Sequence, residues 1–296
     1  MMMNSNILLI GSLNMDFTTY VGRIPDAGET IAGKSFLMSP GGKGLNQAIA
    51  LSRAGSNVYM LGTVGNDSLG NELIDLVKKE KIHSLIKTSN NPTGTAFIFV
   101  EESGQNRITI IHGANYDLTF DDIKNAIDEV ECQYVCFQLE NNIEVIEKGI
   151  KYAKNKGKIV VLNPAPAQKL KDDVFQYIDY FTPNEKELNF YIDENKDLLK
   201  SCTLMLKKGV KNLIVTLGEK GAFFINNNEQ EIIPSFKVKA IDTVAAGDCF
   251  NGYFVSSINK GIKPIEAIKI ANKASSIAVT RMGASKSIPY INEIKM

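Results

Sequence analysis

Short apolar runs alternate with amphipathic segments over most of this chain. Apolar runs of about four to eight residues bounded by glycine or polar residues are typical of buried strands, whereas apolar residues three to four positions apart indicate helices. This pattern predicts strands at 6–12, 58–65, 134–139, 158–164, 179–184 and 212–218, and helices at 43–55, 67–80, 143–157, 170–178 and 198–209. Such alternation favours an α/β fold, with a central, mostly parallel sheet flanked by helices.

Two stretches break this alternation. Residues 17–40 and 94–112 each contain two β-prone runs joined by turn residues, with residues 25–28 as the first turn and residues 103–105 as the second. Neither stretch leaves room for a crossover helix, so each is predicted to be a hairpin. We expect the hairpins to form a small antiparallel β lid beside the main domain. The predicted division is 1–13, 41–93 and 114–296 for the α/β domain, and 14–40 and 94–113 for the lid.

One segment of the first hairpin has the spacing of a P-loop. Gly28, Gly33, Lys34 and Ser35 match the pattern of that phosphate-binding loop. A working P-loop needs a buried strand before it and a helix that starts at its Lys-Ser pair, because the helix amides hold the phosphates. Here the strand-like run FLMSPGG follows Ser35. We therefore interpret the match as accidental.

Composition excludes several classes of protein. The 296 residues include 33 basic and 33 acidic side chains without a basic stripe, which argues against a nucleic-acid partner. No apolar run is long enough for a signal peptide or a membrane span. The four cysteines lack metal-type spacing, and His83 and His112 are too isolated for a metal or catalytic site. We expect a cytoplasmic protein with reduced thiols.

The segment DTVAAGDCFNGYFVSSI, which begins at Asp242, carries the candidate chemistry. The small residues Ala245, Ala246 and Gly247 lead into a helical stretch that starts at Asp248. Small residues let backbone amides turn toward one point, and a helix N-terminus adds partial positive charge, so this pattern predicts an anion hole. Asp248 either caps the helix or acts as a general base facing a phosphoryl group, and spacing alone favours neither interpretation.

The same segment resembles the C-terminal signature of the ribokinase-like (PfkB) carbohydrate kinases. Further motifs are similar to that family in the same order along nearly the whole chain: GSLNMD (11–16), PGGKGLNQA (40–48), GTVGND (62–67), NPAPA (163–167), TPNEKE (182–187), TLGEKG (216–221) and AVTRMGASKSIP (278–289). Within the family the motifs are most similar to the ribokinase branch. The family often has glycine where Ala245 stands, but ribokinase-like members also carry alanine there.

The resemblance implies an ATP-dependent kinase that phosphorylates the 5-hydroxyl of D-ribose. Asp248 would be the general base, and Ala245, Ala246 and Gly247 would stabilise the transferring phosphoryl group. The residues that would bind the sugar are Asn14, Asp16, Gly41, Gly42, Lys43, Asn46, Glu140 and Asp248. Those that would line the ATP site are Asn184, Thr216, Gly218, Gly221, Gly247 and Asn272.

The resemblance also implies two cations and a dimer. Glu187, in the family's NxxE pattern with Asn184, is linked to the Mg²⁺ on ATP, although it also fits an ordinary exposed helix residue. The positions that match a monovalent-cation site, expected to hold K⁺, are Asp242, Val244, Ala278, Arg281, Gly283 and Ser287. The lid is the family's dimer contact, so we expect a homodimer.

Alternatives remain at this point. A related kinase acting on 2-deoxyribose or another pentose or nucleoside differs by contacts that the sequence does not reveal. A sugar-binding regulator that kept the fold without the chemistry is the alternative from another class. The presence of both Gly247 and Asp248 favours the kinase.

Overall fold

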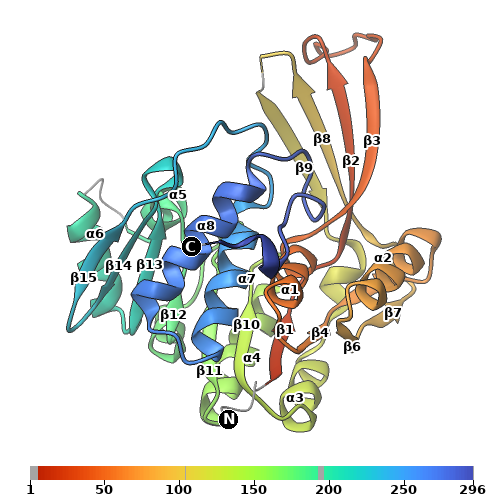
Figure 1. Ribbon diagram of the computed structural model, residues 1–296. Helices are drawn as coiled ribbons and strands as arrows, with labels where there is room; N and C mark the ends of the chain where they lie inside the picture. Colours follow the sequence, from red (N-terminus) through yellow and green to blue (C-terminus); the bar gives the residue numbers. More distant parts are fainter. Residues whose placement is uncertain (1–5, 104, 193–196, 296) are drawn as a thin grey trace.

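A large sheet forms the centre of the molecule (Figure 1). The computed structural model describes residues 6–103, 105–192 and 197–295. Among these residues, the sheet has nine strands in the order β15-β14-β13-β12-β11-β10-β1-β4-β6, all parallel to their neighbours except β14 and β15. The strands are β1 (Asn6–Ile10), β4 (Val58–Leu61), β6 (His83–Ser84), β10 (Cys132–Phe137), β11 (Ile159–Leu162), β12 (Tyr180–Phe181), β13 (Asn212–Thr216), β14 (Ala222–Asn226) and β15 (Gln230–Ile233).

Helices cover both faces of this sheet, so the predicted α/β fold is confirmed. Buried side chains of one face pack with α1 (Lys43–Arg53), α2 (Ser68–Lys79), α7 (Ala246–Asn259) and α8 (Pro264–Ala278). Those of the other face pack with α3 (Phe120–Glu129), α4 (Ile143–Asn155), α5 (Glu185–Phe190) and α6 (Leu198–Lys207). Four 3₁₀ turns are also described, namely η1 (Gly113–Asp117), η2 (Asp172–Tyr177), η3 (Gly218–Lys220) and η4 (Ile291–Glu293).

Strand β1 is apolar at every position from Ile7 to Ile10, and its place in the sheet explains why. Ile7 and Leu9 belong to the core under α1 and α7, whereas Leu8 and Ile10 belong to the core under α3 and α4. Successive side chains of a strand point to opposite faces, so a strand between two helical layers has no polar side. A continuous apolar run is therefore the sequence pattern of this position in the sheet.

Two predicted elements have a different form in the structure. The helix predicted at 170–178 is the 3₁₀ turn η2, whose six residues fit the use of this conformation in short connecting segments. The strand predicted at 179–184 is regular only at Tyr180 and Phe181, and Asn184 forms an isolated bridge with Thr216. Pro183 has no amide to donate, and Asn184 already caps α5, so the strand ends early.

The two predicted hairpins form a second sheet, which projects from the main body (Figure 1). Its strands are β2 (Asn14–Val21), β3 (Ser35–Gly41), β8 (Gly94–Glu101) and β9 (Asn106–Ile111), in the order β3-β2-β8-β9. Each hairpin is antiparallel as predicted, but β2 and β8 pair in parallel where the hairpins join. Gly104, in the second predicted turn, lies outside the described residues. That this sheet is a separate lid domain stays a prediction.

The segment that resembles a P-loop has the wrong surroundings. Residues 29–34, which we expected to begin the second strand of the hairpin, have no regular structure, and β3 starts only at Ser35. A strand, not a helix, therefore follows Lys34. The Lys34 ammonium forms an ion pair with Glu102, on the turn of the other hairpin. The interpretation of this match as accidental agrees with the structure.

A small parallel pair completes the fold. The strand predicted at 58–65 divides at Gly62 into β4 and β5 (Thr63–Gly65), and β5 pairs with β7 (Lys87–Ser89) outside the main sheet. A Cβ at Gly62 would lie 2.4 Å from the Leu13 side chain, so the chain turns where only glycine fits. None of the described helices has the length and apolar character needed to cross a membrane.

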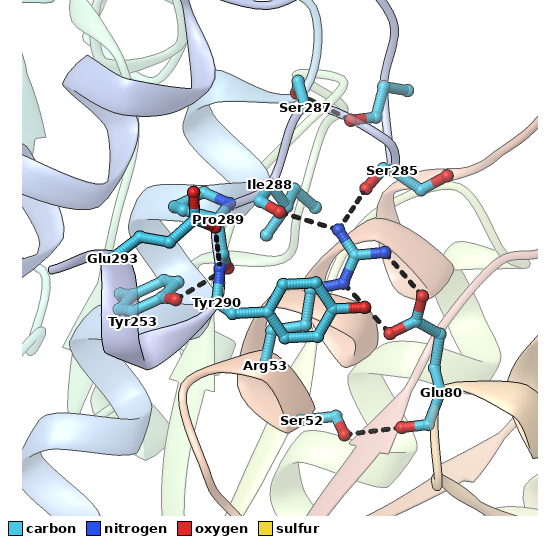
Figure 2. A network of polar contacts seen from close by, with 11 residues as sticks. Ser52, Arg53, Glu80, Tyr253, Ser285, Ser287, Ile288, Pro289, Tyr290 and Glu293 are labelled. Carbon is cyan, nitrogen blue, oxygen red and sulfur yellow. Dashed lines mark hydrogen bonds and ion pairs between the residues drawn. The ribbon is translucent and has the colours of Figure 1, made fainter.

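Arg53, at the end of α1, fastens the C-terminal segment to the main body (Figure 2). Its guanidinium donates to the carbonyls of Ser285 and Ile288 at 2.8 and 2.7 Å and pairs with Glu80 beyond α2. It also stacks 4.7 Å from the Tyr290 ring. The Arg53 and Glu80 side chains are only 10% and 9% exposed, so each charge depends on the other for solvation.

Replacing Arg53 by Met should lower the free energy of unfolding by about 3–5 kcal/mol, because Glu80 would remain buried without its counter-charge. The double variant Arg53→Met with Glu80→Leu should regain part of that loss, since no lone charge is left. Urea unfolding followed by circular dichroism measures this, as the chain has no tryptophan. A double variant no more stable than Arg53→Met would contradict the assigned cause.

Candidate active site

Polar residues converge where the main sheet meets the lid. Asn14 begins β2 soon after β1 ends, and Glu140 follows β10. Lys43 and Asn46 lie in the first turn of α1, and Asp248 lies in the first turn of α7. In α/β proteins the carboxyl ends of parallel strands and the N-termini of adjacent helices form one edge, where ligands usually bind. These predicted sugar-site residues come from four separate parts of the chain.

Hydrogen bonds connect these parts. The side-chain amide of Asn46 donates to Asp248 Oδ2 at 3.1 Å. The backbone amide of Lys43 and the hydroxyl of Ser12 both donate to Glu140 Oε2, at 3.0 and 2.5 Å. Glu140 and Asp248 are buried, so their carboxylates are held in fixed positions by these donors.

Two glycines allow the lid to begin at this point. A Cβ at Gly41 would lie 2.1 Å from Asp16 Oδ2, and Gly42 has a φ of 90°, which favours glycine. Asn14 Oδ1 accepts a hydrogen bond from Asn115 Nδ2 at 2.8 Å, which fixes the orientation of its amide. Asn115, in η1, was not recognised from the sequence because no motif surrounds it.

The charges in this cluster influence one another. Burial acts to lower the pKa of the Lys43 ammonium, but the carboxylates of Asp248, Glu140, Glu187 and Asp16 outweigh it and raise that pKa. For Asp16, burial and then the carboxylates of Glu140 and Asp248 raise the pKa to about 7, despite the opposing charge of Lys43. Lys43 is therefore the positive centre of an otherwise acidic site.

Asp248 is the most enclosed of the candidate catalytic groups. Burial raises the pKa of its carboxyl group, while Lys43 and hydrogen bonds from Gln47 and Asn46 act against the rise. Gln47 Nε2 donates to Asp248 Oδ1 at 3.0 Å, so each carboxylate oxygen has one amide donor. Gln47 was passed over in the sequence, although its position directly after Asn46 was an available signal.

The predicted anion hole is the N-terminus of α7. Ala245 caps this helix in the left-handed conformation, with φ of 59°, which is uncommon for a residue other than glycine. The amides of the first helical turn have no carbonyl partner within the helix. A Cβ at Gly247 would meet nothing within 4 Å, so the backbone there borders open space. This terminus can therefore accept an anionic group.

A pocket of about 840 Å³ opens onto this helix terminus. Five of the residues predicted for the ATP site line it, namely Thr216, Gly218, Gly221, Gly247 and Asn272. The amide of Asn272 donates to the carbonyls of Ile233 and Pro234, at 3.0 and 3.2 Å, so it also holds the end of β15. The pocket is large enough for a nucleotide, and Ala246 and Gly247 of the predicted anion hole are part of its lining.

Part of the pocket lining was missed in the sequence. Residues 235–238 and Ala240 line the pocket but belong to no motif. Ser275 and Ser276 line it from α8. Because they lie three and four positions after Asn272, helical spacing was a signal that could have found them.

Asn184 and Glu187 form a reciprocal cap at the start of α5. Asn184 Oδ1 accepts from the Glu187 amide, and Glu187 Oε2 accepts from the Asn184 amide, each at 2.8 Å. Asn184 does not line the pocket but bridges to Thr216, which does. Glu187 is half-buried, and burial raises its pKa more than the Asn184 amide and Lys43 lower it. Its link to Mg²⁺ stays a prediction.

The segments predicted to bind a monovalent cation lie side by side. Asp242 accepts hydrogen bonds from the amides of Val244 and Gly283, both at 2.9 Å, so this carboxylate joins the two segments. The side chain of Arg281 pairs with Glu293, and the hydroxyl of Ser287 donates to Ala284. No group of three or more His, Cys, Asp or Glu side chains within the described ranges is arranged to hold a metal ion.

Comparisons with known proteins agree with this geometry. The chain matches the model of the pfkB family carbohydrate kinases over residues 4–291. It is 37% identical to a ribokinase of Staphylococcus aureus over 99% of both chains, and 35% identical to a deoxyribokinase of Salmonella typhi over 97% of both. The crystal structure of a ribokinase from Thermotoga maritima superposes with a TM-score of 0.92 at 38% identity, over 98% of each chain.

The family match spans nearly the whole chain. The relatives share more than a third of their residues with it over almost their full length. The motifs that suggested the resemblance fall at the strand ends and helix termini that form this site. The chain belongs to the pfkB family of carbohydrate kinases.

Proposed function

We propose that the protein transfers the γ-phosphoryl group of ATP to the 5-hydroxyl of D-ribose. The observation that carries this proposal is the position of Asp248. Its carboxylate lies in the polar cluster at the base of the lid, and its helix begins at the wall of the nucleotide-sized pocket. A sugar hydroxyl and a terminal phosphate bound in these two places would meet at Asp248 and Gly247. The choice of ribose as the substrate rests on the relatives that are named ribokinase.

The residues then have separable tasks in the reaction. Asp248 takes the proton of the 5-hydroxyl while the oxygen of that hydroxyl attacks the γ-phosphorus. The bond between the γ-phosphorus and the oxygen that bridges it to the β-phosphate breaks, and ADP is released. The amides around Ala245, Ala246 and Gly247 stabilise the negative charge of the transferring group. Their helix terminus needs no reorganisation to do so, because it is fixed by the fold.

The sugar is held by the polar cluster at the base of the lid. Asn46 Oδ1 is buried without a hydrogen-bond partner among the described residues, so an acceptor is ready for a ligand hydroxyl. The further sugar contacts come from Asn14, Asp16, Gly41, Gly42, Lys43 and Glu140. A substrate rich in hydroxyls satisfies these groups better than an apolar one.

2-Deoxyribose is the second candidate substrate, because one relative of similar identity is named deoxyribokinase. It differs by one hydroxyl, and a site built to bond that hydroxyl rejects the substrate that lacks it. Coupled ADP-release assays with ribose, 2-deoxyribose, fructose and adenosine distinguish the candidates. A non-catalytic regulator would release no ADP with any of them.

ATP-dependent transfer requires a divalent cation to offset the phosphate charge, and we assign Mg²⁺ to this task with Glu187 nearby. For K⁺, the fit rests on the donor chemistry: Asp242 supplies a carboxylate, and the segments at 242–244 and 278–287 supply backbone carbonyls beside it. The cation would neutralise Asp242 and preserve the direction of the amides that follow it. It would act away from the sugar.

The outward face of the lid supports the proposed homodimer. Strand pairing places Phe36, Phe97 and Phe99 on the face opposite Asp16, and they are 62%, 42% and 38% exposed. A contiguous apolar patch of this kind marks an association surface. The four cysteines are free and buried, which suits the reducing cytoplasm.

Replacing Asp248 by Asn should lower turnover by at least about 100-fold, because the proton acceptor is lost while the size of the side chain is kept. Ribose affinity, measured by titration calorimetry, should change far less and serves as the control for an intact site. Turnover close to that of the wild type would show that Asp248 has only a structural role.

Ribose affinity should fall as pH decreases below about 7. Burial and neighbouring carboxylates raise the Asp16 pKa to about 7, so the free protein binds a proton there at lower pH. A protonated carboxyl loses acceptor capacity toward sugar hydroxyls, and the affinity should change by up to about tenfold per pH unit. Calorimetry between pH 5.5 and about 8.5 tests this. Asp16→Asn should bind more weakly with a flat profile, and an unchanged slope would exclude Asp16 as the titrating group.

Replacing Na⁺ by K⁺ at equal ionic strength should raise activity with Mg-ATP and ribose, because a large, weakly hydrated cation suits backbone carbonyls better. Thermal stability without substrates should rise in parallel, since binding to the folded state stabilises it. Asp242→Asn should remove both responses. Equal rates and melting temperatures in the two salts would reject the cation site while leaving the kinase assignment intact.

A further inference from the structure

A chain of buried side-chain amides leads away from Asp248 into the protein. Gln47 Nε2 donates to Asp248 Oδ1 and to Asn163 Oδ1, each at 3.0 Å. Gln47 Oε1 accepts from Gln138 Nε2 at 2.8 Å. Asn163 Nδ2 donates to the backbone carbonyl of Thr182 at 2.9 Å. The chain thus connects α1 and α7 with residues that follow β10, β11 and β12.

The direction of every bond in this chain is determined at Thr182. A backbone carbonyl only accepts, so Asn163 must present its NH₂ group to Thr182 and its oxygen to Gln47. Gln47 must then direct its own NH₂ group toward Asn163 and Asp248, and its oxygen toward Gln138. A flipped Gln47 amide would place an acceptor against both Asn163 Oδ1 and Asp248 Oδ1. The amide therefore has one stable orientation, with a donor on the carboxylate.

A second arm leads from the same threonine to the anion hole. The Thr182 hydroxyl donates to Asn251 Oδ1 at 2.6 Å, and Asn251 Nδ2 donates to the Gly247 carbonyl at 2.9 Å. Asn163, Thr182 and Asn251 are all buried, so water does not compete for these bonds. The Thr182 backbone supports the base through Gln47, and its side chain supports the first turn of α7 through Asn251.

We propose that Gln47 and Thr182 are positioning residues that hold the Asp248 carboxylate and the anion hole in a fixed position relative to each other. This inference rests on the proposed function, since it assigns a purpose to the groups around Asp248. Gln47 fixes the rotation of the Asp248 carboxylate about its Cβ–Cγ bond and keeps its remaining acceptor direction toward the sugar. Thr182 fixes the helix turn whose amides receive the phosphoryl charge. Neither residue touches the reacting atoms.

The Gln47 bond also adjusts the acidity of the base. Asp248 lies among Lys43, Glu140, Glu187 and Asp16, and its burial raises the pKa of its carboxyl group. A hydrogen bond to the charged form lowers that pKa. Loss of the Gln47 donor should therefore move the acid limb of the kcat profile to higher pH, in addition to loosening the carboxylate.

The first test is Gln47→Leu. We expect kcat for ribose to fall by about 10- to 100-fold, the scale of a misplaced catalytic group, while the ribose affinity changes by less than about threefold. The acid limb of kcat should move up by about one pH unit. Gln138→Leu is the matched control: it removes a buried amide of the same size but leaves the donor to Asp248, so its acid limb should stay at the wild-type pH.

The second test separates the two arms. Thr182→Val removes the hydroxyl but keeps the carbonyl that orients Asn163, so kcat should fall with the acid limb unchanged. Thr182→Ser keeps the hydroxyl and should retain most of the activity. This pair stays informative if Gln47→Leu does not fold.

Three results would overturn the proposal. The first is a wild-type kcat in Gln47→Leu. The second is a lower kcat in Gln47→Leu with the acid limb of its pH profile unmoved. The third is an equal loss of kcat in Thr182→Val and Thr182→Ser. Each can occur while Asp248→Asn remains inactive, so failure of the positioning role is distinguishable from failure of Asp248 as the base. An active Asp248→Asn would instead refute the base assignment itself.

Discussion

The close contact between α1 and α7 is the constraint on which this site depends. A Cβ at Gly252 would lie 2.3 Å from the Cβ of Ala50, so the helices approach here as only glycine permits. One turn toward the N-terminus of each helix, the same approach brings Asn46 and Gln47 within hydrogen-bond distance of Asp248. A bulkier residue at 252 would separate the helices, and the carboxylate would lose both donors.

Burial of Asp248 has to be compensated because a lone carboxylate away from water is strongly disfavoured. Lys43 supplies the opposite charge, and the amides of Asn46 and Gln47 bond to the two oxygens. Asp16 and Glu140 act in the opposite direction, and the raised pKa of Asp16 reflects that conflict. Acidic groups gathered around a single ammonium suit a site that binds several sugar hydroxyls.

The molecule contains two sequences that suggest phosphate binding, and their surroundings separate them. Lys34 precedes a strand of the lid and pairs with Glu102, so no helix amides are available there. Gly247 lies at the start of a helix of 14 residues whose terminus borders the large pocket. Anion binding by backbone requires free amides at a helix terminus. In the second sequence the amide of Ala246 donates to the Thr243 carbonyl at 3.3 Å, which leaves the amides of Gly247 and Asp248 for an anion. The first sequence has no helix terminus.

The sequence by itself determined the α/β class, both hairpins and the family, and it predicted most of the residues that the structure brings together around Asp248. These follow from local patterns: apolar runs for strands between two layers, turn residues for hairpins, and small residues before an acid for the helix predicted to start at Asp248, which in the structure begins two residues earlier. Only the tertiary structure decided that β2 and β8 pair in parallel, that η2 is a 3₁₀ turn, and which residues support Asp248. Gln47 and Asp248 are 201 positions apart, and Thr182 and Asn251 are 69 apart. Strand order and helix packing create such contacts, and no local pattern in the chain records which strand ends will become neighbours.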